Sequence, residues 1–172
     1  AREEMPIDIL MLIDVSGSMQ SHVERVAVAS REALNVLGEE DRVAIMVFDR
    51  STRVRLQFQK DRRQIENGLS GILHQETFDG GTDINRGLQD AISYVSRQAR
   101  RDARRAIVIL TDDQSERGTD QNAINRSLAN ENIVLSSLIA PDALGTGGWS
   151  RGGGGGWPSG GGMGGPLGGI IF

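Results

Sequence analysis

The 172 residues are enough for one folded domain with a single core, and their 38% hydrophobic content is ordinary for a globular protein. The net charge of −4 disfavours general nucleic-acid binding, and the lack of cysteine excludes a disulfide framework, a thiolate zinc site and a thiol nucleophile. No apolar run approaches the roughly 20 residues of a membrane-spanning helix, so we expect no direct membrane insertion of this segment.

Glycine is distributed unevenly, since 15 of the 23 glycines lie between Gly145 and Gly169. This shift predicts a folded domain over residues 1–144 and a glycine-rich flexible tail or insertion over residues 145–172. The compartment stays open, although the glycine content and the two tryptophans of this region, Trp149 and Trp157, slightly favour an envelope or secreted setting over the cytoplasm.

In chain order, the first predicted elements are a buried strand, a helix and a hairpin. Residues 7–13 form a nearly continuous apolar run, which is typical of a strand covered on both faces. Apolar residues then recur at helical spacing from about Met19 to Leu37. The run at residues 43–48 predicts a second buried strand, and alternating residues at 52–58 predict an antiparallel edge strand paired with it.

Helices and strands alternate in the rest of the folded region. Residues 65–73 predict a short helix, and a longer helix follows Thr82 and Asp83, either of which could cap it. Strands are predicted at residues 106–110 and 133–139, with a helix at about 119–130 between them. This alternation predicts an α/β fold with a doubly wound, mostly parallel sheet, one antiparallel edge strand and helices on both faces.

Polar side chains follow the first buried strand at a regular spacing, as Asp14, Ser16 and Ser18. If this stretch joins a buried strand to a helix, the three side chains can converge on one point. Ligands of such folds bind beyond the carboxyl ends of the strands, where the connections diverge. The strand at residues 106–110 leads to Asp112 and is expected to flank the same point. Oxygen donors of this kind predict a hard divalent cation.

Three segments occur in order along the chain: Asp14-x-Ser16-x-Ser18, Gly80-Gly81-Thr82-Asp83 and Ile109-Leu110-Thr111-Asp112. Together they resemble the von Willebrand factor type A domain and its metal-ion-dependent adhesion site, over about residues 6–140. The resemblance implies a Rossmann-like sheet with strands in the order 3-2-1-4-5. It also implies a metal site made of Asp14, Ser16, Ser18, Thr82 and Asp112.

By this resemblance, Ser16 and Ser18 bind the metal directly, Thr82 binds it directly or through water, and Asp14 and Asp112 act largely through water. Mg²⁺ suits such a site because it prefers six oxygens and readily keeps bound water, with Mn²⁺ or Ca²⁺ as the alternatives. With few carboxylates bound directly, the cation keeps much of its positive charge. An Asp or Glu side chain of a protein partner is then expected to complete its coordination.

Two features depart from the family pattern. Asp113 stands where the family commonly has glycine, so Asp83 and Asp113 are candidates for an additional acidic shell. These acids would raise the metal affinity, favour Ca²⁺ or Mn²⁺, or repel an acidic ligand, and these alternatives stay open. In addition, the family's usual sixth strand and final helix have no counterpart before the glycine-rich region.

The resemblance implies a protein-binding module that is not an enzyme. The alternative is a subunit that cooperates with a AAA+ ATPase in complex assembly or metal insertion. A metal-dependent hydrolase is least favoured, because Ser16 stands where aspartyl phosphatases need a second aspartate. His22 and His74 are the only two histidines and are interpreted as surface or loop residues. The oligomeric state does not follow from the sequence.

Overall fold

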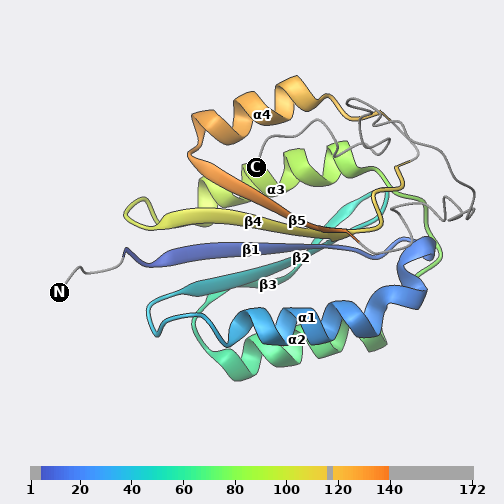
Figure 1. The fold of residues 1–172 in the computed structure, drawn as a ribbon, viewed down its shortest axis with the longest axis horizontal. Helices are drawn as coiled ribbons and strands as arrows, with labels where there is room; N and C mark the ends of the chain where they lie inside the picture. The colour runs from blue at the N-terminus through green and yellow to red at the C-terminus, as the bar shows by residue number, and fades with distance from the viewer. Residues whose placement is uncertain (1–4, 116–117, 140–172) are drawn as a thin grey trace, which may run out of the picture.

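The computed structural model describes residues 5–115 and 118–139. One sheet lies between two layers of helices (Figure 1). Its strands are β1 (Ile7–Asp14), β2 (Arg42–Phe48), β3 (Thr52–Gln59), β4 (Arg104–Thr111) and β5 (Ile133–Ile139). The helices are the 3-10 helix η1 (Gly17–His22), α1 (Val23–Leu34), α2 (Arg62–Gln75), α3 (Ile84–Gln98) and α4 (Gln121–Asn130).

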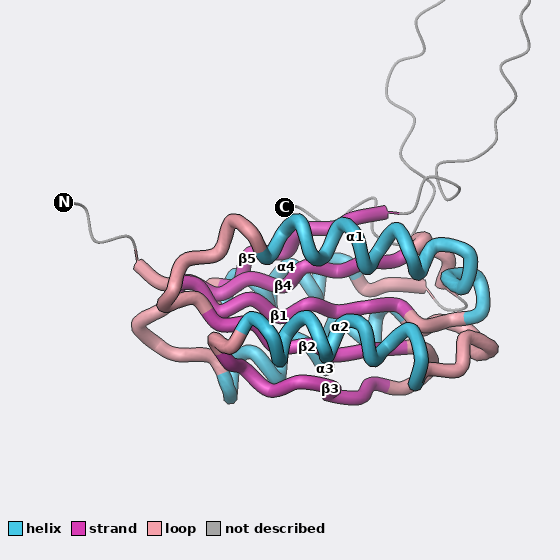
Figure 2. The backbone as a smooth tube through the Cα atoms, turned by 90° about the horizontal axis from the view of Figure 1, so that it is seen from below, coloured by secondary structure: helices cyan, strands magenta, loops and turns pink. Residues whose placement is uncertain are grey.

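The strand order is β3-β2-β1-β4-β5, as the family resemblance implies. Strand β1 pairs in parallel with β2 and β4, and β4 pairs in parallel with β5. Only β3 is antiparallel within this sheet, where it pairs with β2 at one edge. Figure 2 shows the strands side by side, with α1 and α2 in front of them. The predicted fold class is confirmed.

Both faces of the central strands are buried, which explains their continuous apolar runs. Leu10 and Leu12 of β1 pack in the core under α3 and α4, whereas Met11 and Ile13 pack in the core under α1 and α2. The chain leaves β1 toward α1 and leaves β4 toward α4, on opposite faces of the sheet (Figure 1). The connections therefore diverge between the carboxyl ends of β1 and β4, where α/β folds bind ligands.

The helix predicted over residues 19–37 is two elements. It starts as η1, in which the Met19 amide donates to the Ser16 carbonyl at 3.0 Å, and α1 ends early at Leu34. Beyond that point the Asn35 and Leu37 amides bond to carbonyls only three residues back, so the α-helical pattern stops. Helix α2 extends on both sides of the residues 65–73 that mark it, and at its start the Asp61 side chain caps it by accepting from the Arg63 and Gln64 amides.

The interpretation of His22 as a surface or loop residue is wrong, because His22 is only 6% exposed in the described fold. His74 is exposed at the end of α2, as predicted. Among residues 5–115 and 118–139, no helix is long and apolar enough to cross a membrane. The predicted glycine-rich region at 145–172 lies outside the described residues.

Candidate metal centre

The end of β1 and the start of η1 bring three of the predicted site residues together. The Asp14 carboxylate accepts hydrogen bonds from the Ser16 amide at 2.9 Å and from the Thr111 hydroxyl at 2.7 Å. The hydroxyl oxygens of Ser16 and Ser18 lie 3.1 Å apart. Ser16 is buried and Ser18 is exposed. The carboxylate is thus fixed in direction, and the pair of hydroxyls leads from it toward solvent.

The environment of Asp14 disfavours negative charge. The residue is 1% exposed. Burial raises the pKa of the Asp14 carboxyl to about 6, although hydrogen bonds from Ser16 and Thr111 act to lower it, and the negative charge of Asp112 adds to the rise. Asp112 is itself 2% exposed. Two neighbouring buried carboxyl groups would be stabilised in their ionised form by a cation beside them.

Thr82 reaches the same edge of the sheet because backbone hydrogen bonds hold the chain on either side of it. The Gly17 amide donates to the Gly80 carbonyl at 2.9 Å, and the Asp83 amide donates to the Asp49 carbonyl at 3.0 Å, just beyond β2. Thr82 is 2% exposed. Its hydroxyl oxygen is of the ligand type that a hard divalent cation binds.

The two acidic candidates for an additional shell have distinct local roles. Asp83 caps α3, since its side chain accepts from the Arg86 amide at 3.0 Å, so capping falls to Asp83 and not to Thr82. Asp113 has a φ of 59°, in the left-handed region that favours glycine and that Asp tolerates better than most residues. This backbone conformation gives a physical reason why glycine suits the position after Asp112.

Sequence reasoning missed two hydroxyl residues that support the site. Thr111 is fully buried, and its hydroxyl donates to Asp14 and accepts from the Asp113 amide at 3.1 Å. The Ser115 hydroxyl donates to the Thr82 carbonyl and accepts from the Ile84 amide, both at 3.3 Å. A polar residue at the end of the apolar run before Asp112 was a usable signal for Thr111. Ser115 had none, because its partners lie more than 30 residues away.

The predicted ligands are chemically suited to a hard divalent cation, because hydroxyl and carboxylate oxygens are what such ions prefer. These predicted ligands are Asp14, Ser16, Ser18, Thr82 and Asp112. The part of the chain that the structure describes has no group of three or more His, Cys, Asp or Glu side chains arranged to hold a metal, so a cation here depends on the hydroxyls. Oxygens roughly 2.0–2.1 Å from Mg²⁺ in an octahedron are about 2.9 Å from their neighbours. The 3.1 Å between the hydroxyls of Ser16 and Ser18 is close to that spacing.

A family model decides how the chain is classified. The model of the von Willebrand factor type A domain matches residues 9–115, which is more than half of the chain. The chain belongs to the von Willebrand factor type A domain family. One relative of this A domain is the uncharacterized protein sll0103 of Synechocystis sp., which is 27% identical over 123 residues. The alignment covers 70% of this chain and 28% of that protein, so the chain spans less than a third of the relative's length.

Solved structures share the fold of this A domain. The manganese-loaded TRAP protein of Plasmodium vivax matches with a TM-score of 0.67 and 19% identity, over 77% of this chain and 56% of that chain. Proximal thread matrix protein 1 from the mussel byssus, with a zinc-occupied MIDAS motif, matches with a TM-score of 0.63 and 18% identity, over 78% of this chain and 38% of that chain. At such identities the likeness shows the fold alone.

Proposed function

We propose that this A domain binds one divalent cation at the carboxyl ends of β1 and β4, and that the bound cation captures an Asp or Glu side chain of a protein partner. Mg²⁺ is the proposed ion, with Mn²⁺ or Ca²⁺ as alternatives. The observation that carries the proposal is the pair of hydroxyls on Ser16 and Ser18, 3.1 Å apart and next to the buried carboxylate of Asp14. Domains of this family commonly mediate metal-dependent protein interactions.

In the proposed site, Ser16, Ser18 and Thr82 supply neutral oxygens, while Asp14 and Asp112 supply negative charge largely through water. The cation therefore keeps enough positive charge to attract a carboxylate from outside. Thr111 holds the Asp14 carboxylate by a hydrogen bond of 2.7 Å and so fixes its direction. Ser18 is exposed whereas Ser16 and Thr82 are buried, so a partner reaches the site from the solvent side at η1.

A divalent metal is also supported by two structures of the same fold, one named as manganese-loaded and one as having a zinc-occupied MIDAS motif. Cooperation with a AAA+ ATPase, a metal-dependent hydrolase activity and the favoured extracytoplasmic setting stay predictions from the sequence. The identity of the partner is a property of a whole protein rather than of one domain. The relative sll0103 is much longer than this chain, since the alignment covers only 28% of it.

Manganese relaxation of water protons tests both parts of the proposal. Mn²⁺ titrated into the protein should give one binding site, seen as enhanced relaxation of water protons. Acetate carries the carboxylate group of Asp and Glu, and it should lower the enhancement in a saturable way as it replaces a bound water. Ser18→Ala should weaken Mn²⁺ binding by at least about tenfold. Ser21→Ala removes an exposed hydroxyl of the same helix η1 and should leave binding unchanged.

Three results would contradict the proposal. The first is an absence of Mn²⁺ binding by the wild-type protein, and the second is equal binding by the Ser18→Ala and Ser21→Ala variants. The third is a relaxation enhancement that acetate does not alter. That result would contradict the proposed binding of a carboxylate but not the proposed cation site.

Thr82→Val keeps the shape of a buried side chain and should weaken Mn²⁺ binding as Ser18→Ala does.

A further inference from the structure

We infer that a network of ion pairs outside the metal centre holds the Thr82 segment in position, with Arg53 as its central positioning residue. The network consists of Asp49, Arg53, Arg55 and Glu76. None of these residues belongs to the proposed metal site. The consequence for metal binding rests on the proposed function, whereas the structural role of the network does not.

The contacts of Arg53 join two carboxylates that are far apart in the sequence. Its guanidinium donates to both oxygens of Asp49, at 3.2 and 3.1 Å, and to Oε2 of Glu76 at 3.1 Å. Arg55 forms an ion pair with the other oxygen of the Glu76 carboxylate. The Glu76 side chain is only 4% exposed, so its charge is held between two arginines of β3. Such charge-assisted and partly buried contacts are stronger than surface ion pairs.

Asp49 connects this network directly to the segment that carries Thr82. Its carboxylate binds Arg53, and its backbone carbonyl accepts the hydrogen bond from the Asp83 amide at 3.0 Å. Burial acts to raise the pKa of Asp49, but hydrogen bonds from Arg53 and Ser51 lower it below its usual value, which keeps the carboxylate ionised. Asp49, the residue just after β2, therefore both binds Arg53 and holds the residue after Thr82.

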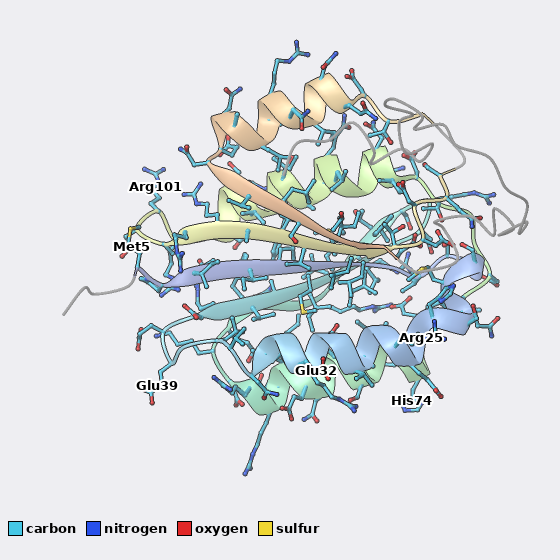
Figure 3. The ribbon with its side chains drawn as sticks, in the orientation of Figure 1. Met5, Arg25, Glu32, Glu39, His74 and Arg101 are labelled. Carbon is cyan, nitrogen blue, oxygen red and sulfur yellow. The ribbon has the colours of Figure 1, made fainter. Side chains whose placement is uncertain are left out.

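The segment at residues 76–83 is fastened at three points. Glu76 is held by Arg53 and Arg55, the Gly80 carbonyl by the Gly17 amide, and the Asp83 amide by Asp49. A Cβ added at Gly80 would lie 3.5 Å from the Asp49 Cβ, which shows how closely the two pass. The segment follows His74, which Figure 3 shows on α2 at the same end of the molecule as Arg25 of α1. Thr82 lies between the last two fastening points.

The backbone that carries Thr82 is thus positioned by the hydrogen bonds of its neighbours Gly80 and Asp83. Loss of Arg53 would release Glu76 and leave Asp49 without its main cationic partner. The Thr82 segment would then move more freely relative to β2, whereas Ser16 and Ser18 would stay on the β1 side. Metal affinity would fall mainly through Thr82, in the way that residues supporting a ligand commonly act.

Hydrogen exchange and calorimetry of Arg53→Met test the inference. Exchange of the Asp83 amide, followed by NMR without metal, should become faster in the variant. The dissociation constant for Mg²⁺ should rise about tenfold. In a Thr82→Val background, Arg53→Met should change the constant by less than about twofold, because both substitutions act on the same ligand. Lys60→Met is the matched control, since it removes an exposed ion pair with Glu40. Lys60 follows Gln59, at the end of β3 far from Asp49.

Unchanged exchange of the Asp83 amide in Arg53→Met would overturn the inference, as would an equal change in Lys60→Met. Faster exchange with an unchanged dissociation constant would overturn the link from the network to the metal site. If the effects of Arg53→Met and Thr82→Val on the free energy of Mg²⁺ binding were fully additive, the claim that Arg53 acts through Thr82 would be overturned. If the wild-type protein binds no cation, the proposed function fails, and the exchange measurement still decides whether the network holds the segment.

Discussion

Thr111 connects the ends of β1 and β4 through the hydrogen bonds of its hydroxyl. Its hydroxyl donates to Asp14, at the end of β1, and accepts from the amide of Asp113, just after β4. One buried hydroxyl therefore orients a carboxylate and also stabilises the turn that carries Asp112. Local sequence pattern identified Asp14 and Asp112 as site candidates. It did not show that Thr111 joins them, because that contact spans 97 residues.

Asp113 tests the conformation of this turn. Its φ of 59° is strained for most side chains, by about 1 kcal/mol or more, whereas glycine adopts it freely. Asp113→Gly should therefore keep or slightly raise the free energy of unfolding, while Asp113→Ala should lower it by about 1 kcal/mol. Urea unfolding of the three proteins measures the order. An alanine variant as stable as the glycine variant would show that the turn does not need the left-handed conformation.

At the scale of the elements, α3 helps to position Thr82, because the helix begins at Ile84 and Asp83, the residue next to Thr82, is its N-cap. The helix packs closely on β2, where a Cβ added at Gly87 would lie 2.8 Å from the ring of Phe48. Phe48 is fully buried at the end of β2, so its ring has little room to move. The close contact at Gly87 thus fixes the distance between α3 and the sheet near the site.

Gly87→Ala should lower the free energy of unfolding by about 1–2 kcal/mol, because overpacking against Phe48 outweighs the gain in helix propensity. Gly71→Ala in α2 is the matched control. There the added Cβ would meet only the flexible side chain of Gln75, at 3.4 Å, so helix propensity should raise stability by up to about 1 kcal/mol. Chemical denaturation should give effects of opposite sign, and stabilisation by both substitutions would contradict the close packing of α3.

Much of this level of structure followed from local patterns. Solid apolar runs identified β1, β2 and β4, since strands buried on both faces need apolar residues at nearly every position. Alternation identified β3 as an edge strand. The division of the first helix into η1 and α1 was not foreseen, because its apolar spacing continues through both parts. Asp83 was among the foreseen caps, whereas the Asp61 cap of α2 was not recognised.

At the scale of the whole molecule, a cluster of ion pairs around Asp8 lies at the end of the sheet opposite to the candidate metal centre. Asp8 of β1 is fully buried, and its carboxylate accepts hydrogen bonds from Arg42 of β2 at 3.0 Å and from the side chain of Arg100 at 2.7 and 3.0 Å. Arg100 lies just after α3 in an arginine-rich stretch and binds this buried carboxylate, whereas the next residue, Arg101, is exposed at this end of the molecule (Figure 3).

The Asp8 cluster predicts how stability depends on pH. Burial acts to raise the pKa of Asp8, but the hydrogen bonds from Arg42 and Arg100 outweigh it and lower the pKa to about 2. Because the pKa is lower in the folded state, the stabilisation is present above the ordinary pKa near 3.9 and is lost as the pH falls toward 2. About 2 kcal/mol should be lost between pH 5 and pH 2.

Urea unfolding of the wild type and of Asp8→Asn at several pH values isolates this effect. The variant should be less stable by about 3 kcal/mol at pH 7, because two arginines lose a buried charged partner. The difference between the two proteins should shrink by about 2 kcal/mol on going from pH 5 to pH 2. A difference that stays constant over this range would show that Asp8 is not held ionised in the folded protein.

The topology of the whole molecule could be predicted, and so could the three segments of the candidate site, because each segment stands at the end of a recognisable strand or the start of a helix. The supporting contacts could not. Ser115 contacts Thr82 across 33 residues, and Arg53 contacts Glu76 across 23 residues. Side chains that meet only after folding leave no periodic signal in the sequence, so their roles become visible only in the structure.

Anomalous diffraction from crystals of the protein grown with Mn²⁺ and acetate tests the central claim most directly. The account predicts one strong manganese peak within roughly 2.5 Å of the Ser16 and Ser18 hydroxyl oxygens, with Thr82, Asp14 and Asp112 around it and an acetate oxygen or water on the solvent side. A manganese peak elsewhere on the domain, with none beside Ser16 and Ser18 at saturating Mn²⁺, would contradict the account.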